Sequence, residues 1–234
     1  MKIEAHRKIL LVAIFVLLFV PLLATTSHGE DSLSEFKLSA GIDYAMEFDQ
    51  FGYSVDISGN TAVVGAPFSD LVYVFQYDES ISTWGEDPVA VLTAPVPAGK
   101  ELFGWSVAID GDTVVVGTLD LSSYIGSAYV FTRSGGSWNE GQQLIFGAGI
   151  GASVAISGDT VVVGSIIPVS SAYVFRYLYD DSMGTWDWVQ ETELKAPPGA
   201  PLFGWAVDLS GDTAVVGGPL PGSAYAVTRN GDSW

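Results

Sequence analysis

The sequence has 234 residues, of which 48% are hydrophobic, 15% are charged and 12% are aromatic. This apolar content argues against an intrinsically disordered chain, because it is enough to bury a sizeable core. The formal charge of −18 disfavours nucleic acid and anionic membrane surfaces as partners. The absence of cysteine excludes a disulfide framework. Many aromatic and few basic residues are typical of an all-β chain.

Residues 1–29 have the layout of a secretory signal peptide, expected to be helical. Lys2, Arg7 and Lys8 precede an apolar run from Ile9 to Ala24. This run is shorter than the roughly 20 residues that span a bilayer, so cleavage is favoured over an uncleaved anchor. Cleavage would leave six basic and 26 acidic residues, a formal charge of −20. We therefore expect a secreted or cell-surface protein whose mature part does not insert into the membrane.

One segment recurs four times along residues 30–234. The copies are FGYSVDISGNTAVVGAP from Phe51, FGWSVAIDGDTVVVGT from Phe103, IGASVAISGDTVVVGS from Ile150 and FGWAVDLSGDTAVVGGP from Phe203. Their second residues are glycines spaced by 52, 47 and 53 positions. A motif repeated at such a period indicates an array of equal structural units.

Each unit contains the pattern of four short strands. The first two strands are separated by Gly-Asn or Gly-Asp, which favours a type II′ hairpin. The second strand, such as 161–163, is apolar at every position, so both of its faces are expected to be buried. Four-stranded antiparallel units of this length are the blades of β-propellers. We therefore predict one β-propeller region at 30–234, with blades at about 51–102, 103–149, 150–202 and 203–234, and with 33–40 as an extra outer strand.

Phe51-Gly52 and Gly65-Ala66-Pro67 are the two halves of the FG-GAP repeat. From about residue 33 onward the chain resembles that family, whose best-known members are the β-propellers of integrin α-subunits. The Phe-Gly half returns at 103–104 and 203–204, whereas the third unit has Ile150-Gly151. The resemblance implies a propeller that usually has seven blades.

Only four blades are present here, and two explanations remain open. We expect the chain to be part of a larger propeller, because an interrupted blade leaves an exposed sheet edge. The alternative is that the run around Phe36 to Leu38 closes a four-bladed ring by pairing with the last unit.

The resemblance also raises the question of calcium, which integrin-type blades often bind between their first two strands. Here that loop is reduced to Ser-Gly-Asp-Thr or a close variant. One aspartate cannot supply the six to eight oxygens that calcium needs. We predict no metal and no cofactor, and a turn-forming role for Asp112, Asp159 and Asp212.

Few residues suited to catalysis are present, and we predict that the protein is not an enzyme. Both histidines, His6 and His28, lie in the export segment, which excludes Cys-His and Ser-His-Asp systems from the mature chain. Paired carboxylates leave a glycoside hydrolase as an alternative. The arginines that follow the third strands are not expected to converge on one centre; they are Arg133, Arg176 and Arg229.

The loops between the second and third strands and those between blades share one face of a propeller. They are the variable parts of this sequence, and variable loops on a rigid repeat are common recognition sites. Tyr53, Trp105 and Trp205 occupy equivalent positions in three blades, while Asp120 and Tyr124 belong to one loop. We predict that these five residues contact a ligand. The alternative for the three aromatic residues is packing between blades.

These features predict a binding or adhesion module that recognises extracellular protein or polysaccharide. The alternatives are a carboxylate-based glycoside hydrolase and a structural matrix or surface component without catalysis.

Overall fold

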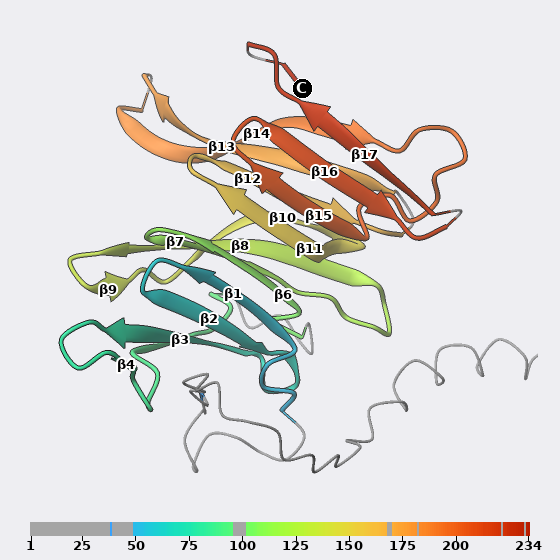
Figure 1. The fold of residues 1–234 in the computed structure, drawn as a ribbon. Coiled ribbons are helices and arrows are strands. Elements are labelled where there is room, and N and C mark those ends of the chain that lie inside the picture. The colour runs from blue at the N-terminus through green and yellow to red at the C-terminus, as the bar shows by residue number, and fades with distance from the viewer. Residues whose placement is uncertain are drawn as a thin grey trace, which may run out of the picture. The chain divides into compact units, whose positions relative to one another are not determined.

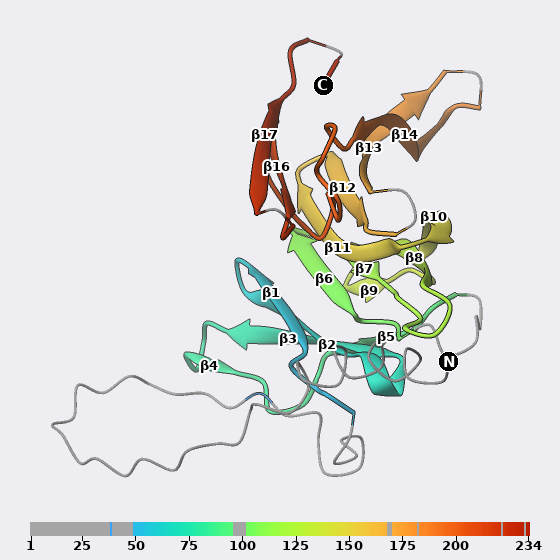
Figure 2. The ribbon, with the colours of Figure 1, turned by 90° about the vertical axis from the view of Figure 1, so that its right-hand side faces the viewer.

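Each repeat of the sequence forms one antiparallel sheet, which we call blades 1 to 4 (Figures 1 and 2). The computed structural model describes residues 38, 49–95, 102–167, 170–181, 183–220, 222–231 and 233–234. The predicted signal peptide at 1–29 lies outside the described residues, as does the segment 33–40 apart from Leu38. No α-helix occurs among the described residues, and the predicted all-β class is confirmed.

Blades 1 and 2 have the same strand order. Their fourth strand is interrupted, so that two short pieces pair separately with the third strand. Blade 1 contains β1 (Ser54–Ser58), β2 (Thr61–Ala66), the 3-10 turn η1 (Pro67–Ser69), β3 (Leu71–Asp78), β4 (Thr83–Trp84) and β5 (Ala90–Leu92). Blade 2 contains β6 (Ser106–Asp110), β7 (Thr113–Gly117), β8 (Ile125–Ser134), β9 (Ser137–Trp138) and β10 (Gln142–Ala148).

Blade 3 has four uninterrupted strands and blade 4 has three. Blade 3 contains β11 (Ile150–Ser157), β12 (Thr160–Ser165), β13 (Ser171–Asp180) and β14 (Thr185–Lys195). Blade 4 contains β15 (Ala206–Ser210), β16 (Thr213–Gly218) and β17 (Ser223–Thr228). After β17, the backbone bridge between Asn230 and Ser233 forms a short turn.

The first hairpin of every blade has the predicted two-residue loop. In blade 1, Ser58 pairs with Thr61 and leaves Gly59 and Asn60 as the loop. Gly59 has a φ of 55°, whereas Asn60 is not among the residues with positive φ. A positive φ at the first loop position alone is the requirement of a type II′ turn, and glycine meets it without steric cost.

The blades stack face to face in chain order, with one apolar core at each junction. Figure 2 shows β1, β6 and β11 following one another while the other strands of each sheet extend away from them. Val63 of blade 1 and Val116 of blade 2 share the first core, and Val115 and Val163 share the second. Val162 and Val216 share the third. The second strands of blades 2 and 3 are buried on both faces because each one lies between two neighbouring blades, as the continuous apolar pattern predicts. In blade 4 the prediction is only partly met, because β16 has one neighbouring blade among the described residues and its Val215 is 42% exposed.

The Phe-Gly half of the motif builds the contact between blades. Phe103 is 1% exposed and lies in the core between blades 1 and 2, where its ring contacts Tyr129 and Phe131 at centroid distances of 5.9 Å. Burial of such a ring stabilises the fold by roughly 1.5–3 kcal/mol. Phe51 makes the equivalent ring contacts in blade 1, and Leu38 packs against the same cluster.

Candidate functional site

The face formed by the β2–β3, β7–β8, β12–β13 and β16–β17 loops, which we call the loop face, is the candidate binding surface. Residues 53, 105 and 205 also lie on this face. Each of them immediately precedes the first strand of its blade, and the beginning of that strand pairs with the end of the second strand. Antiparallel pairing places the two-residue hairpins and the third-to-fourth strand turns at the opposite end of each blade.

Tyr53 and Trp105 come together although 52 positions separate them. Their ring centroids lie 4.7 Å apart with an interplanar angle of 44°. Tyr53 is 45% exposed, and its partial burial raises the pKa of the phenol above 10.0. The pair therefore packs across the junction of blades 1 and 2 and still presents aromatic surface to solvent.

Trp205 begins blade 4 and is 52% exposed. Ala152 takes the equivalent place in blade 3. The aromatic series is therefore interrupted in blade 3. Within this series, Tyr53 and Trp105 are the two residues whose rings contact each other in the described part of the chain.

Asp120 organises the β7–β8 loop. Its Oδ1 accepts hydrogen bonds from the Ser122 hydroxyl and the Ser122 backbone N–H, both at 2.7 Å, and Oδ2 accepts one from the Ser123 hydroxyl at 2.8 Å. These bonds, with that of the Ser122 hydroxyl the strongest, lower the pKa of Asp120 to about 2. Its carboxylate thus has a structural role within the loop, and a direct contact with a ligand stays a prediction.

The same loop presents Tyr124, which is 40% exposed and has a φ of 56°. Its backbone N–H donates to the Asp120 carbonyl at 2.7 Å, and its own carbonyl accepts from Gly149 N–H at 2.5 Å. The backbone bonds hold the ring at the surface in a conformation that non-glycine residues rarely adopt. Such a fixed, exposed aromatic residue is suited to ligand contact.

Every blade adds a large exposed apolar side chain to this face. Of these residues, only Tyr124 was singled out in the sequence; the signal that could have identified the others was an apolar residue inside a turn-rich segment. They are Phe68 in blade 1, Leu121 and Tyr124 in blade 2, Ile167 in blade 3 and Leu220 in blade 4. Apolar exposure repeated over one face is a common property of interaction surfaces.

Most of the basic side chains that the structure describes lie on the opposite face. Arg133 pairs with Asp112 at 2.6 Å, Arg176 with Asp159 at 2.9 Å and Arg229 with Asp212 at 3.8 Å, each within one blade. Burial raises the pKa of Asp159, but hydrogen bonds from Arg176 and Thr160 and the charge of Arg176 outweigh it, so the pKa is lowered. The turn aspartates therefore have arginine partners.

Two of the three arginines also meet, which differs from the sequence-based expectation. Arg176 and Arg229 lie 3.8 and 3.5 Å from Oε1 of Glu191, and Trp234 donates its indole N–H to Oε2 at 3.0 Å. The three charged side chains are at most 18% exposed. This cluster joins blade 3 to the residues after β17, and its groups are occupied with one another.

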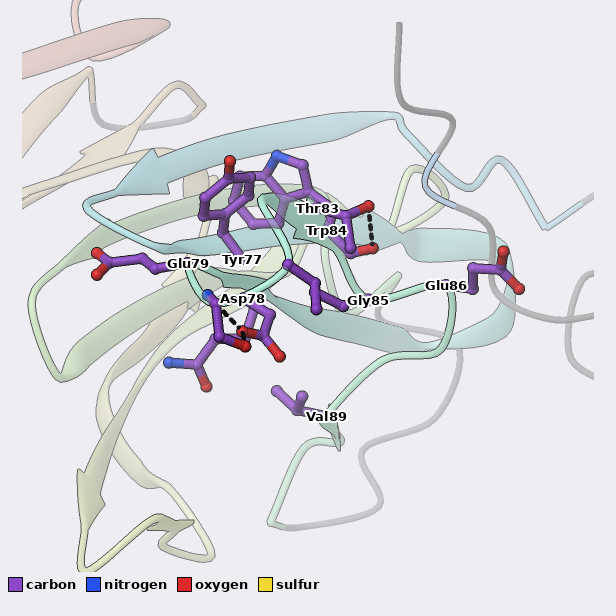
Figure 3. A pocket seen from close by; sticks show the side chains of 11 residues that line it. Tyr77, Asp78, Glu79, Thr83, Trp84, Gly85, Glu86 and Val89 are labelled. Carbon is purple, nitrogen blue, oxygen red and sulfur yellow. Dashed lines mark hydrogen bonds between the residues drawn. The ribbon is translucent and has the colours of Figure 1, made fainter. Parts of the chain in front are cut away.

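An open hollow of about 730 Å³ lies at the β3–β4 hairpin. Tyr77 and Trp84 line it and pack edge to face, with ring centroids 5.6 Å apart. Figure 3 shows that Glu79 and Glu86 point in different directions. Asp78 accepts hydrogen bonds from Ser80, the hydroxyl at 2.6 Å. The polar groups of this hollow do not converge, so the loop face remains the better candidate site.

The stacked antiparallel sheets define a β-propeller fold, and its loop face with exposed apolar side chains is the form of a ligand-binding module. The FG-GAP repeat family matches residues 36–75 and 84–131. The chain therefore contains FG-GAP repeats in these residues.

No curated protein matches the chain significantly. Solved structures with a similar fold include the β-propeller domain of Cps50 (Swd1) from Myceliophteria thermophila, with 9% identity, a TM-score of 0.45 and coverage of 76% of this chain and 53% of that one. Hsv2 of Kluyvelomyces marxianus has 13% identity, a TM-score of 0.44 and coverage of 74% and 46%. The chain spans about half the length of these proteins.

Proposed function

We propose that this protein is a secreted or cell-surface recognition module that binds extracellular protein or polysaccharide through the loop face. The observation that carries the proposal is the contact between the exposed ring of Tyr53 and the partly buried ring of Trp105, which are brought together from neighbouring blades. Tyrosine and tryptophan offer large rigid contact areas with a polar edge and are enriched among residues that dominate binding energy. The secretory layout of residues 1–29 supports an extracellular location.

The surroundings favour ligands held by apolar and hydrogen-bonding contacts. The three described arginines lie on the opposite face with aspartate partners. The net charge of −18 disfavours polyanionic ligands such as sulfated glycans. A neutral polysaccharide or an uncharged to basic protein surface fits this arrangement.

The glycoside hydrolase alternative needs a general acid, normally a carboxyl group of raised pKa. The pKa values of Asp78, Asp120 and Asp159 are all lowered. None of these three is therefore suited to that role, and an assay for released reducing sugar tests the remaining carboxylates.

The binding proposal is tested on an array of glycans and matrix proteins, followed by two alanine variants. We expect Trp105→Ala and Trp205→Ala each to weaken binding of the ligand found by about 30-fold, the effect of losing roughly 2 kcal/mol at a dominant contact. Trp186, which is 58% exposed on the opposite hairpin of blade 3, provides the control Trp186→Ala. Unchanged affinity in the two loop-face variants would refute the assignment, and a loss of folding would show a packing role instead.

A further inference from the structure

Four aromatic rings form a continuous strip on the β13–β14 hairpin of blade 3. Tyr177 contacts Trp188 at a ring-centroid distance of 5.3 Å and stacks on Trp186 at 5.5 Å, with an interplanar angle of 23°. Trp186 in turn contacts Tyr179 at 5.5 Å. Tyr177 pairs with Trp188 and Tyr179 pairs with Trp186 in the strand register, so all four side chains project from the same face of the hairpin. We call these four residues the aromatic strip.

The aromatic strip lies on the side of blade 3 that faces blade 2. Trp188 is 9% exposed and belongs to the core that these two blades share. The other three rings lie nearer the turn, and Tyr177, Tyr179 and Trp186 are 37%, 49% and 58% exposed. The strands of both blades lie within the described residues. The exposure of the strip therefore does not depend on what precedes blade 1 or follows blade 4.

The outer half of the strip has no counterpart in blades 1 and 2. Trp84 and Trp138 take the place of Trp188 in those blades, and one further residue pair completes each of their hairpins. In blade 3 three further pairs follow Trp188, and one of them is Tyr179 with Trp186. The longer hairpin thus adds two aromatic rings at the surface, and exposed aromatic side chains that lie together are typical of interaction sites.

Blade 2 shows a group that the equivalent tryptophan accommodates. Arg133 occupies the position of Tyr177, because the backbone N–H of each donates to the carbonyl of the turn aspartate in its own blade. The guanidinium carbon of Arg133 lies 5.5 Å from the centre of the Trp138 ring, and Nη2 lies 2.6 Å from Oδ1 of Asp112. An arginine of this chain thus lies over the tryptophan of the repeat and pairs with a carboxylate. In blade 3 a tyrosine replaces that arginine.

The charge of the β13–β14 hairpin also favours a cation. Residues 177–189 include three aspartates and no lysine or arginine, and two of these aspartates, Asp181 and Asp187, are exposed. Oδ1 of Asp187 accepts hydrogen bonds from Nε2 of Gln142 in blade 2 and from the backbone N–H of Trp188, both at 2.7 Å. These bonds hold one carboxylate at the boundary with blade 2, between the two tryptophans in sequence. A cationic group complements this surface, and an anionic group is repelled by it.

We propose that the aromatic strip binds an exposed arginine of a partner protein. A guanidinium is planar, so it stacks on tryptophan and tyrosine rings while its N–H groups donate to a carboxylate. Met183, in the turn of the hairpin, is 75% exposed and adds apolar contact area. Tyrosine, tryptophan, methionine and arginine are all enriched in protein interfaces. The strip lies at the hairpin end of the blade, opposite the loop face, and this proposal is independent of the ligand that the loop face binds.

The first test measures binding of three acetylated and amidated peptides to the full chain by calorimetry. The peptides carry arginine, lysine or the uncharged arginine analogue citrulline, each spaced by glycine and serine. At about 150 mM sodium chloride, where general attraction to an acidic surface is screened, the lysine peptide should bind about threefold more weakly than the arginine peptide. The citrulline peptide should bind at least about tenfold more weakly. Lysine or citrulline peptides that bind as tightly as the arginine peptide refute the proposal.

The second test compares two variants with the arginine peptide. Trp186→Ala removes the most exposed ring of the strip and is expected to weaken binding about tenfold or more. The control is Phe146→Ala, because Phe146 is an aromatic residue of similar exposure, 59%, on β10 of blade 2. This control should bind like the wild type. Unchanged affinity in Trp186→Ala, or equal losses in both variants, contradicts the assignment. Circular dichroism and thermal unfolding show whether each variant is folded.

A third measurement uses the unaltered protein and so does not depend on how the variants fold. In NMR spectra, the indole N–H resonance of Trp186 should shift when the arginine peptide is added. The resonances of Trp105 and Trp205, on the loop face, should stay in place. A Trp186 resonance that does not move overturns the proposal. A shift of that resonance on addition of neutral cellohexaose also overturns it, because it would identify the strip as a glycan site.

Discussion

At each of the three blade junctions, two glycines are required by the contact between blades. Glycine at 104, 151 and 204 adopts a φ between 82° and 97°, and its carbonyl occupies the space where a side chain of the preceding blade would lie. These glycines of the motif are therefore needed where two repeats meet, and a single repeat taken alone does not show why glycine is required.

Gly164→Ala is expected to destabilise the protein by about 1–3 kcal/mol, because the new methyl group overlaps the rigid backbone of Gly204. Gly217→Ala is the matched control at the same position of blade 4, where the nearest atom lies 3.7 Å away. Its effect should stay within about 0.5 kcal/mol. Urea unfolding measures the change in the free energy of unfolding for both variants. Equal effects would contradict the contact.

The pKa of Asp120 also makes a residue-scale prediction. It is lowered from 3.8 to about 2 in the folded state, so the ionised carboxylate stabilises its loop above about pH 4. This contribution is lost as the pH falls toward 2. Carboxyl chemical shifts followed by NMR should give a midpoint near 2. In Ser122→Ala/Ser123→Ala the midpoint should rise toward 3.8, and a wild-type midpoint near 3.8 would contradict the hydrogen bonding described here.

At the scale of strands, the junction of blades 3 and 4 depends on charge as well as apolar packing. Glu191 on β14 receives Arg176 from β13, Arg229 from the segment after β17, and the indole of Trp234. The single pairs on the two-residue hairpins are more exposed, and ion pairs of that kind contribute little.

Glu191→Gln is expected to destabilise the protein by about 1.5–3 kcal/mol, since it removes the charge shared by two poorly exposed arginines. Asp112→Asn is the control, because Asp112 is 64% exposed and has one partner; we expect a loss of about 0.2–1 kcal/mol. Thermal and urea unfolding rank the two variants. A larger loss in Asp112→Asn would show that the cluster at Glu191 does not stabilise the junction.

For the whole molecule, the dominant electrostatic property is a large surplus of negative charge. The formal charge of −18 opposes the compact state through self-repulsion, which salt screens. The turn aspartates of blades 2 to 4 are neutralised by arginines of their own blades.

We expect the melting temperature to rise with ionic strength, and calcium chloride to be no more effective than sodium chloride of equal ionic strength. Calorimetry with both salts checks this. A calcium-specific increase that disappears in Asp112→Asn, Asp159→Asn and Asp212→Asn would show that a calcium site exists at the hairpins.

Several features of the fold were predictable because they depend on neighbouring residues. Strand positions follow from apolar periodicity, as in 161–163, and the hairpin turns follow from glycine at a position that needs positive φ. The period of the motif was sufficient to predict stacked antiparallel blades. The three aromatic positions 53, 105 and 205 were found from their equivalence between repeats.

The contacts between repeats required the tertiary structure. The sequence left packing between blades as one alternative for Tyr53 and Trp105, and only the structure shows that these two rings contact each other. Sequence position alone did not indicate that two arginines share Glu191, or that Asp120 is occupied by its own loop. Local periodicity determines which residues form strands and which face is apolar. The relative placement of side chains about 50 residues apart depends on how one sheet lies on the next, and that geometry decides which polar groups are used internally and which remain available for a ligand.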